Sequence, residues 1–280
     1  MCHALLLCCG DVADPPSVRF RAAHSFGVVS DRDAVRSALS GLCAELSERT
    51  GLIFFGHVVR SYAALLADVK QKRIDFAWAP PLVAAELIQQ GVAEALVTSR
   101  REASSLFHSA LFVHRDSGLV EVGDLEGKHI GWVDSASAAG YAVPRRWLRD
   151  RGCDLDSFFG RESFLGTHAA VARAVFERRV DVGATYAILD GGSRQTRDGG
   201  WNEVAIPDAG IHIVSLAGTV PADCVVGATE LPPSSRAKVR SALVELGTGA
   251  SPLVQKVFRT SGFEVANPGY TGALARLSVV

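Results

Sequence analysis

Residues 52–81, LIFFGHVVRSYAALLADVKQKRIDFAWAPP, decide the fold class of this sequence. The apolar run at 52–59 predicts a buried strand, and Ser61 can cap the helix that follows it. A second apolar run, IDFAWAP, predicts another strand, which ends at the pair Pro80 and Pro81. A strand, a helix and a strand in this order are typical of a parallel βαβ unit.

The same alternation extends in both directions along the chain. Before this stretch, a strand predicted near residues 18–30 is followed by a helix that Gly51 would end. After it, strands and helices alternate again over residues 108–186. Two such series predict two α/β lobes, each with a mixed, mostly parallel sheet flanked by helices.

The lobes are expected to be joined by two crossings of the chain, near residues 99–107 and 206–212. The segment 190–202, DGGSRQTRDGGWN, is rich in glycine and charge and is predicted to be a loop. The predicted division is residues 1–16 as an N-terminal tail, 17–105 plus 212–280 as lobe 1, and 106–211 as lobe 2.

Composition excludes several functional classes. The 280 residues carry a net charge of −1, which gives no basic surface for a nucleic acid or an anionic membrane. No apolar run approaches the roughly 20 residues that a membrane span needs. The six cysteines show no paired spacing, and no suitable cluster of histidines, cysteines and carboxylates occurs, so neither a metal nor a cofactor is expected.

The first ten residues, MCHALLLCCG, are apolar but begin without a basic residue, and their apolar core is short. An export signal normally has a basic start and an apolar stretch of about 7–15 residues. The segment therefore predicts a cytoplasmic protein if the sequence is complete, or a start that is truncated or misassigned.

Residues 134–144, DSASAAGYAVP, form the first candidate site. Asp134 is expected to end a strand, and a helix begins near Ser137. The first turn of a helix leaves N–H groups without acceptors and favours an anion. Ala138 and Ala139 have no bulk that would block its approach. The alternative is that Ser137 only caps the helix, and the motif alone leaves both interpretations open.

Further candidates lie at two helix starts and two strand ends. Thr167 can cap a helix with His168 in its first turn, where a neutral imidazole could donate a hydrogen bond. Tyr62 begins another helix, Trp78 lies at the end of a strand, and Asp223 starts a strand after a possible crossing. Packing or a place in a turn is the plain alternative for each residue alone, but their convergence in one cleft favours a binding site.

Three stretches resemble the phosphate, phosphite and phosphonate substrate-binding proteins of ABC transporters, the PhnD-like family. They are SYAALLADVKQKRIDFAWAPP, DLEGKHIGWVDSASAAGYAVPRRWLRDRG and FLGTHAAVARAVFERRVDVGATY, in the family's order and spacing, within residues 18–225. The resemblance implies the type 2 periplasmic-binding-protein fold, in which two lobes close on a ligand by hinge bending.

The resemblance also implies which residues bind the ligand. Tyr62 matches the family's first-lobe tyrosine, His168 matches the histidine of its GxH motif, and Ser137 matches the first hydroxyl of its anion-binding STSG turn. Asp223 matches a carboxylate that meets the ligand's amine in aminophosphonate binders. The full predicted set is Tyr62, Trp78, Phe107, Ser137, Ala138, Ala139, His168, Tyr186 and Asp223.

This sequence departs from the family pattern at three of these positions. Ala138 and Ala139 stand where the family usually has Thr and Ser, and Phe107 stands where a tyrosine is common. Each missing hydroxyl could have supplied a charge-assisted hydrogen bond of about 1.5–3 kcal/mol. A phosphonate is therefore expected to bind more weakly than in the parent pattern, or the ligand is a carboxylate or a less polar molecule.

The expected function is that of a non-catalytic solute-binding protein, which captures a small anionic ligand and presents it to an ABC-transporter permease or a sensor. The resemblance implies a periplasmic or other extracytoplasmic location. The main alternative is a cytosolic enzyme on the same fold, similar to chorismate dehydratases or pyrimidine synthases. A sensory domain detached from a larger receptor is the third interpretation.

Overall fold

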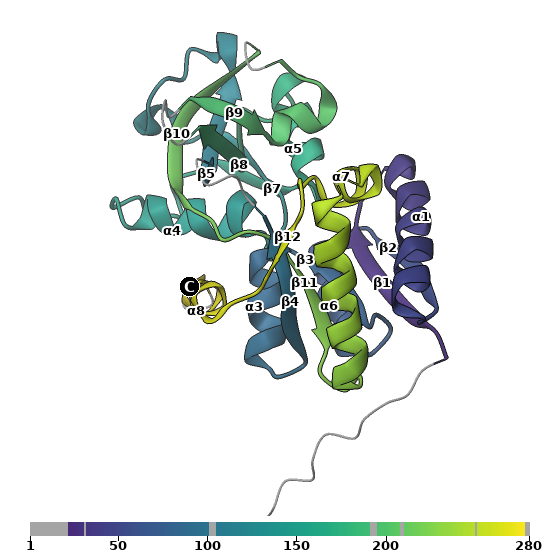
Figure 1. Cartoon of the computed structure of the whole chain (residues 1–280). Coiled ribbons are helices and arrows are strands. Elements are labelled where there is room, and N and C mark those ends of the chain that lie inside the picture. The colour runs from purple at the N-terminus through teal and green to yellow at the C-terminus, as the bar shows by residue number, and fades with distance from the viewer. Residues whose placement is uncertain are drawn as a thin grey trace, which may run out of the picture.

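The computed structural model describes residues 22–30, 32–100, 105–190, 195–207, 210–249 and 251–277. Two six-stranded sheets, each flanked by helices, form two lobes, with lobe 2 above lobe 1 in Figure 1. The two-lobed α/β class that the sequence predicts is confirmed. The predicted N-terminal tail, residues 1–16, lies outside the described residues.

Lobe 1 contains a mixed sheet in the order β12-β4-β11-β3-β1-β2. β1 pairs in parallel with β2 and β3, whereas β11 and β12 join the sheet antiparallel. The strands are β1 (His24–Val29), β2 (Phe54–Val59), β3 (Phe76–Ala79), β4 (Ala93–Ser99), β11 (Cys224–Ala228) and β12 (Phe263–Val265). The helices are α1 (Asp33–Thr50), α2 (Tyr62–Lys70), α3 (Pro81–Gln89), α6 (Pro233–Thr248), α7 (Pro252–Phe258) and α8 (Pro268–Leu277).

Helices cover both faces of this sheet because successive strand side chains point to opposite sides. Phe76 packs into the apolar cluster beneath α1, α6 and α7, and its neighbour Ala77 packs into the cluster beneath α2, α3 and α8. The near-continuous apolar runs in the sequence follow from this burial on two faces.

Lobe 2 contains a sheet in the order β10-β5-β8-β6-β7, with β9 paired to β8. Its strands are β5 (Ser105–His114), β6 (His129–Trp132), β7 (Arg161–Phe164), β8 (Val182–Asp190), β9 (Thr196–Gly199) and β10 (Ile211–Thr219). Its helical elements are η1 (Arg115–Ser117), η2 (Val122–Leu125), η3 (Ala138–Ala142), α4 (Val143–Arg149), α5 (His168–Phe176) and η4 (Gly200–Val204).

The chain returns to lobe 1 later than the sequence predicts. β10 pairs antiparallel with β5, from Ile211 opposite His114 to Thr219 opposite His108, so it belongs to lobe 2. The predicted boundary at 211 and 212 is therefore wrong, and the return crossing lies between β10 and β11. A strand's own apolar pattern does not tell which sheet it joins, since that choice depends on a partner about 100 residues away.

The segment 190–202 is only partly the predicted loop, and residues 191–194 lie outside the described ranges. β9 and η4 occupy most of the remainder. A Cβ at Gly199 would lie 2.4 Å from the ring of the buried Trp201, and one at Gly200 would lie 2.0 Å from Thr185 Oγ1. These glycines therefore permit close packing rather than a flexible turn.

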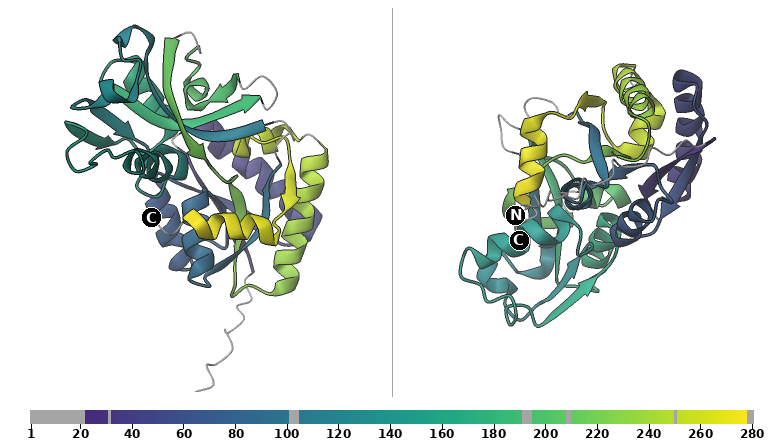
Figure 2. Two further views of the ribbon diagram at one scale, coloured as in Figure 1. Left: turned by 90° about the vertical axis from the view of Figure 1, so that its left-hand side faces the viewer. Right: turned by 90° about the horizontal axis from the view of Figure 1, so that it is seen from below.

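The last helix, α8, packs on α3 beside the junction of the lobes, as the two views of Figure 2 show. Its Leu277 contacts an apolar cluster that includes Leu82 of lobe 1 and Val143 of lobe 2. Within the described ranges, no helix is long and apolar enough to cross a membrane.

Candidate functional site

A cavity of about 420 Å³ lies between the two lobes. It is lined by residues of both lobes and of the chain crossings. All nine residues predicted from the sequence contribute to this lining: Tyr62, Trp78, Phe107, Ser137, Ala138, Ala139, His168, Tyr186 and Asp223.

Three helices that begin at this cavity share one local sequence pattern. A hydroxyl residue at the N-cap is followed by one variable residue, an alanine, and then an alanine or a glycine. In each helix the cap hydroxyl accepts the N–H of the third helical residue at 3.0 or 3.1 Å. The three sets are Ser61-Tyr62-Ala63-Ala64, Ser137-Ala138-Ala139-Gly140 and Thr167-His168-Ala169-Ala170.

This capping leaves the first two N–H groups of each helix available to a ligand. The carbonyl oxygens of the three cap residues accept the next backbone N–H groups. The Leu65 N–H donates to Ser61, the Val171 N–H donates to Thr167, and the Ala142 N–H donates to Ser137. N–H groups at a helix start, together with the helix dipole, favour an anion. Each of the three helix starts contributes to the lining of the cavity. One of these starts belongs to lobe 1 and two belong to lobe 2.

The turn at Ser137 is held tightly in place. Its hydroxyl accepts the N–H of Gly140, and a Cβ at Gly140 would lie 2.3 Å from Val133 Cγ2, so only glycine fits there without rearrangement. Ser109 of β5 donates a hydrogen bond to the carbonyl oxygen of Ala139 at 2.7 Å. Ser137 therefore caps the helix and also lines the cavity, so the two interpretations of this motif are compatible.

His168 is held as a neutral imidazole at the start of α5. Burial lowers the pKa of His168 to about 4, and the positive charge of Arg259 adds to this effect. Its Nδ1 lies 2.8 Å from the hydroxyl of Thr185. If that hydroxyl donates to Nδ1, the imidazole carries its proton on Nε2 and can donate it to a ligand.

Aromatic side chains form one wall of the cavity. The rings of Phe107 and Tyr186 stack with centroids 5.3 Å apart and planes 8° apart, and His168 meets Tyr186 edge-on at 5.0 Å. The Tyr186 hydroxyl donates to Glu203 Oε1 at 3.0 Å. Burial, together with the negative charge of Glu203, raises the pKa of Tyr186, so the phenol stays protonated.

Tyr62 brings a second neutral phenol to the cavity from the start of α2. Burial raises its pKa, and the nearby carboxylates of Asp223, Glu203 and Asp134 raise it further. A protonated phenol can donate a hydrogen bond to an anion. Tyr62 also contacts the apolar cluster of lobe 2, so its ring spans the gap between the lobes.

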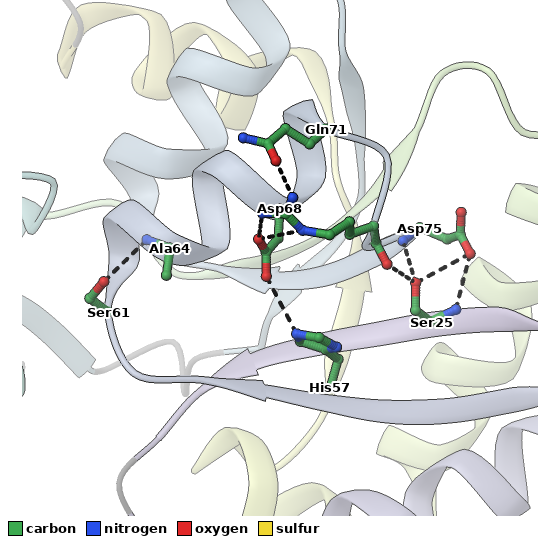
Figure 3. A network of polar contacts seen from close by, with 8 residues as sticks. Ser25, His57, Ser61, Ala64, Asp68, Gln71 and Asp75 are labelled. Carbon is green, nitrogen blue, oxygen red and sulfur yellow. Dashed lines mark hydrogen bonds and ion pairs between the residues drawn. The ribbon is translucent and has the colours of Figure 1, made fainter.

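A polar network connects α2, whose first residue is Tyr62, to the neighbouring strands of lobe 1; Figure 3 shows its contacts at Asp68, His57, Ser25 and Asp75. Asp68 of α2 accepts a hydrogen bond from Arg73 Nε at 2.9 Å and lies 3.4 Å from His57 Nε2 on β2. Close by, the backbone N–H of Ser25 donates to the Asp75 carboxylate at 3.0 Å, and the Asp75 N–H donates to Ser25 Oγ at 3.0 Å. The Asp68–His57 contact joins α2 to β2, and the Ser25–Asp75 contacts join β1 to the start of β3.

Trp78 and Asp223 complete the predicted set on the lobe 1 side. The Trp78 ring packs against Phe258 at 5.0 Å and Phe263 at 6.0 Å, so the residue lines the cavity and also belongs to the lobe 1 core. The carbonyl oxygen of Asp223 accepts the N–H of Ser99 at 3.0 Å. This bond fixes the return crossing against the end of β4.

Several charged residues of the cavity escape sequence reasoning, among them Asp198, Glu203 and Arg259. Asp198 lies in the segment 190–202 predicted to be a loop, Glu203 directly follows that segment, and Arg259 follows α7 without any motif around it. Arg259 Nη2 lies 3.4 Å from Asp198 Oδ2, and Nη1 lies 3.6 Å from Glu203 Oε1. No local signal reveals these contacts because they join two lobes. Within the described ranges, no group of His, Cys, Asp and Glu residues is suited to hold a metal ion.

Two α/β lobes with a cavity at helix starts between them define a substrate-binding protein of the type 2 periplasmic-binding class. A family model described as ABC transporter, phosphonate, periplasmic substrate-binding protein matches residues 26–269. The chain therefore belongs to this family, which confirms the family predicted from the sequence and its solute-binding function.

Several solved structures have the same fold as this chain. A binding protein component of an ABC phosphonate transporter from Pseudomonas aeruginosa has 20% identity and a TM-score of 0.74, covering 92% of this chain and 86% of that one. PhnD1 from Prochlorococcus marinus, in complex with methylphosphonate, has 16% identity, a TM-score of 0.73 and coverages of 91% and 97%. XAC2383 from Xanthomonas citri, bound to ATP, has 22% identity, a TM-score of 0.73 and coverages of 92% and 96%.

Proposed function

We propose that this protein captures an organic anion, a phosphonate or a carboxylate, in the interlobe cavity and presents it to an ABC-transporter permease outside the cytoplasm. The family assignment supports the transport role and the location. The observation that carries the proposal for the ligand is the convergence of three helix starts on one cavity. Their amides and dipoles favour a single negative head group.

We assign the head group of the ligand to the three helix starts. The N–H groups there, the His168 imidazole and the Tyr62 phenol are all neutral donors, so the anion supplies the charge for each hydrogen bond. The apolar part of the ligand lies against the aromatic wall formed by Phe107 and Tyr186. Asp223 receives an amine if the ligand has one.

The size of the cavity favours a ligand larger than methylphosphonate. Cavities of about 300–1,000 Å³ hold drug-sized molecules, and 420 Å³ falls in this range. Methylphosphonate, the ligand of PhnD1, would leave much of that space to water, whereas XAC2383 binds the much larger ATP. We therefore expect an organic substituent of several heavy atoms on the anionic group.

Calorimetric titration tests this proposal with methylphosphonate, 2-aminoethylphosphonate, phenylphosphonate, phosphate and acetate. We expect the two larger phosphonates to bind more tightly than phosphate and acetate, since they fill the head-group site and the apolar wall together. Recovery of the ligand unchanged, followed by ³¹P NMR, separates binding from an enzymatic reaction. Equal affinities for all five compounds, or binding of none of them, would contradict the proposed ligand class.

A further inference from the structure

Arg259 has an unusual backbone conformation for a long side chain. It follows α7 with φ 53° and ψ 37°, and its N–H bonds to the carbonyl oxygen of Gln255. Glycine is the usual residue in this left-handed conformation at a helix end, because a Cβ there is unfavourable. A helix stop alone does not require an arginine, so the side chain is the feature to explain.

The Arg259 guanidinium reaches two carboxylates of the opposite lobe. α7 lies at the edge of lobe 1 next to lobe 2, whereas Asp198 belongs to β9 and Glu203 to η4 of lobe 2 (Figure 1). The guanidinium nitrogens lie 3.4 Å from Asp198 Oδ2 and 3.6 Å from Glu203 Oε1. One side chain therefore joins the two lobes through two ion pairs.

Lobe 2 orients both carboxylates without help from Arg259. Asp198 Oδ1 accepts hydrogen bonds from the Gly199 N–H at 2.8 Å and from Asn202 Nδ2 at 3.0 Å. Glu203 Oε1 accepts the Tyr186 hydroxyl at 3.0 Å. The acceptor pair is thus formed in lobe 2 alone, and only the closeness of the lobes brings the guanidinium to it.

We propose that Arg259, with Asp198 and Glu203, is an interlobe clasp that stabilises the closed state of the cavity. Arg259 acts as a positioning residue for ligand binding rather than as a ligand contact. The clasp rests on the proposed capture of a ligand between the lobes and on the hinge closure expected of this fold, but not on the identity of the ligand. A contact present only in the closed state shifts the equilibrium toward that state and raises the apparent affinity of any ligand that binds it.

The clasp is coupled to the ligand side of the cavity through Glu203. The same oxygen, Oε1, accepts the hydroxyl of Tyr186 and faces Arg259. Tyr186 lines the cavity and contacts Phe107 and His168. A ligand that packs against Tyr186 therefore stabilises the closed arrangement of the lobes. The Arg259 guanidinium, on the other side of Glu203, stabilises the same arrangement.

Arg178 provides a matched internal comparison. It also follows a helix, α5, with a positive φ of 58°, and its guanidinium lies 3.7 Å from Asp116. Both members of that pair belong to lobe 2, so their distance does not change when the lobes open. Both arginines have a left-handed backbone conformation, and each forms an ion pair with an aspartate. The ion pair of Arg259 joins the two lobes, whereas the ion pair of Arg178 lies within lobe 2.

The test compares Arg259→Gly with Arg178→Gly. Glycine suits the left-handed conformation, so neither change strains the backbone, and each removes one positive charge. Interlobe distances are measured by pulsed electron spin resonance on the protein without ligand, with labels at the exposed positions Arg36 in α1 and Arg149 in α4. We expect the short-distance population of the wild type to decline in Arg259→Gly and to persist in Arg178→Gly.

Stopped-flow dissociation of the tightest-binding phosphonate gives the second readout. We expect Arg259→Gly to speed ligand release by about three- to tenfold, as for two partly exposed ion pairs, with little change in association. Asp198→Asn should speed ligand release less when it is added to Arg259→Gly than when it is made alone, because the ion pair is already broken in Arg259→Gly. Arg259→Lys should retain part of the effect.

Identical distance distributions in the wild type and Arg259→Gly would overturn the clasp. Faster release with unchanged distances would also overturn it, because Arg259 would then contact the ligand directly. If no phosphonate binds, the ligand proposal fails, and the distance measurement still decides the clasp.

Discussion

The two walls of the cavity offer a ligand different kinds of contact. Lobe 2 provides two helix starts, the neutral His168 and the stacked pair Phe107 and Tyr186, all held by bonds within that lobe. Lobe 1 provides one helix start, with Tyr62, and residues that reach across the gap, including Arg259.

This difference indicates a division of roles between the lobes. We propose that lobe 2 provides a preformed seat for an anion, because its donors are held by bonds within that lobe. In this proposal lobe 1 closes over that seat and supplies the last donors. Binding to lobe 2 followed by closure of lobe 1 is consistent with hinge motion of rigid lobes. The predictions below test whether the seat and the closing wall can be separated.

The largest expected effect is the loss of single donors from the two walls. His168→Ala and Tyr62→Ala should each weaken phosphonate binding by about 10- to 100-fold, since each removes a hydrogen bond to a charged group. His168→Ala, in lobe 2, should reduce phosphonate affinity more than Tyr62→Ala, in lobe 1. Calorimetry gives the affinities, and thermal unfolding reports whether the fold remains intact.

Phe164→Ala, which truncates an exposed lobe 2 residue outside the cavity lining, serves as the control for these variants. Unchanged affinity in both His168→Ala and Tyr62→Ala would place the site elsewhere. A larger loss for Tyr62→Ala would reverse the assigned roles. A collapse of thermal stability would instead identify the residue as part of the core.

A gain of roughly tenfold is expected when hydroxyls return to the lobe 2 turn. Ala138→Thr together with Ala139→Ser should strengthen binding of tetrahedral oxyanions, because each regained donor contributes about 1 kcal/mol after desolvation. Acetate should gain less, since it has no third oxygen. Titrations with methylphosphonate, phosphate and acetate measure this selectivity.

Ala63→Ser is the matched control for the double change. Ala63 occupies the same second helical position as Ala139, but its side chain is exposed on lobe 1 and does not line the cavity. We expect phosphonate affinity to stay within twofold for this variant. Equal affinities before and after the Ala138 and Ala139 changes would show that these alanines did not retune the site.

The third effect concerns pH. The pKa of His168 is lowered from 6.5 to about 4 in the folded state, so the unfolded chain binds a proton that the folded chain does not. The contribution of neutral His168 to the free energy of unfolding is complete above about pH 6.5 and is lost as the pH falls toward 4. The loss is on the order of 1 kcal/mol or more, since one pKa unit corresponds to about 1.4 kcal/mol.

Denaturant unfolding of the wild type and His168→Gln between pH 7 and pH 4 measures this difference. The variant keeps a polar side chain that does not titrate, so its stability should fall less steeply over this range. Parallel curves for the two proteins would show that the environment of His168 does not depress its pKa.

The smallest effect is expected from the helix caps. Ser61→Ala in lobe 1 and Thr167→Ala in lobe 2 each remove a cap hydrogen bond, which costs about 1 kcal/mol of stability. If lobe 2 is the preformed seat, Thr167→Ala should also weaken phosphonate binding more than Ser61→Ala does. Calorimetric titration and thermal unfolding of both variants compare the two helix starts, and the reverse order would contradict the division of roles.

The features of the site that are local can be predicted from the sequence. A hydroxyl cap followed by small residues can be recognised within four positions, which is why the turns at Ser137 and Thr167 were found. The lining by Phe107 and Tyr186 followed from family resemblance and not from local pattern. The same reasoning could not find the Arg259 contacts, because they depend on how two separately folded lobes meet.

Two further errors have the same physical origin. Gly199 and Gly200 indicated a loop by composition, but they are small because Trp201 and Thr185 pack against them. The strand at 211–219 was assigned to the wrong lobe because its partner, β5, is distant in the sequence. In both cases the deciding contact is tertiary, and no local window of sequence contains it.

The most direct measurement of the central claim is an NMR titration of the protein labelled with ¹⁵N-alanine. The second residue at each of the three helix starts is an alanine: Ala63, Ala139 and Ala169. If one anion is shared by all three starts, the amide signals of these alanines should shift downfield together on adding the tightest-binding phosphonate, with a single dissociation constant. Ala242, buried within α6, should stay unchanged. Shifts confined to one lobe, or absent from all three alanines while calorimetry shows binding, would contradict an anion site shared between the lobes.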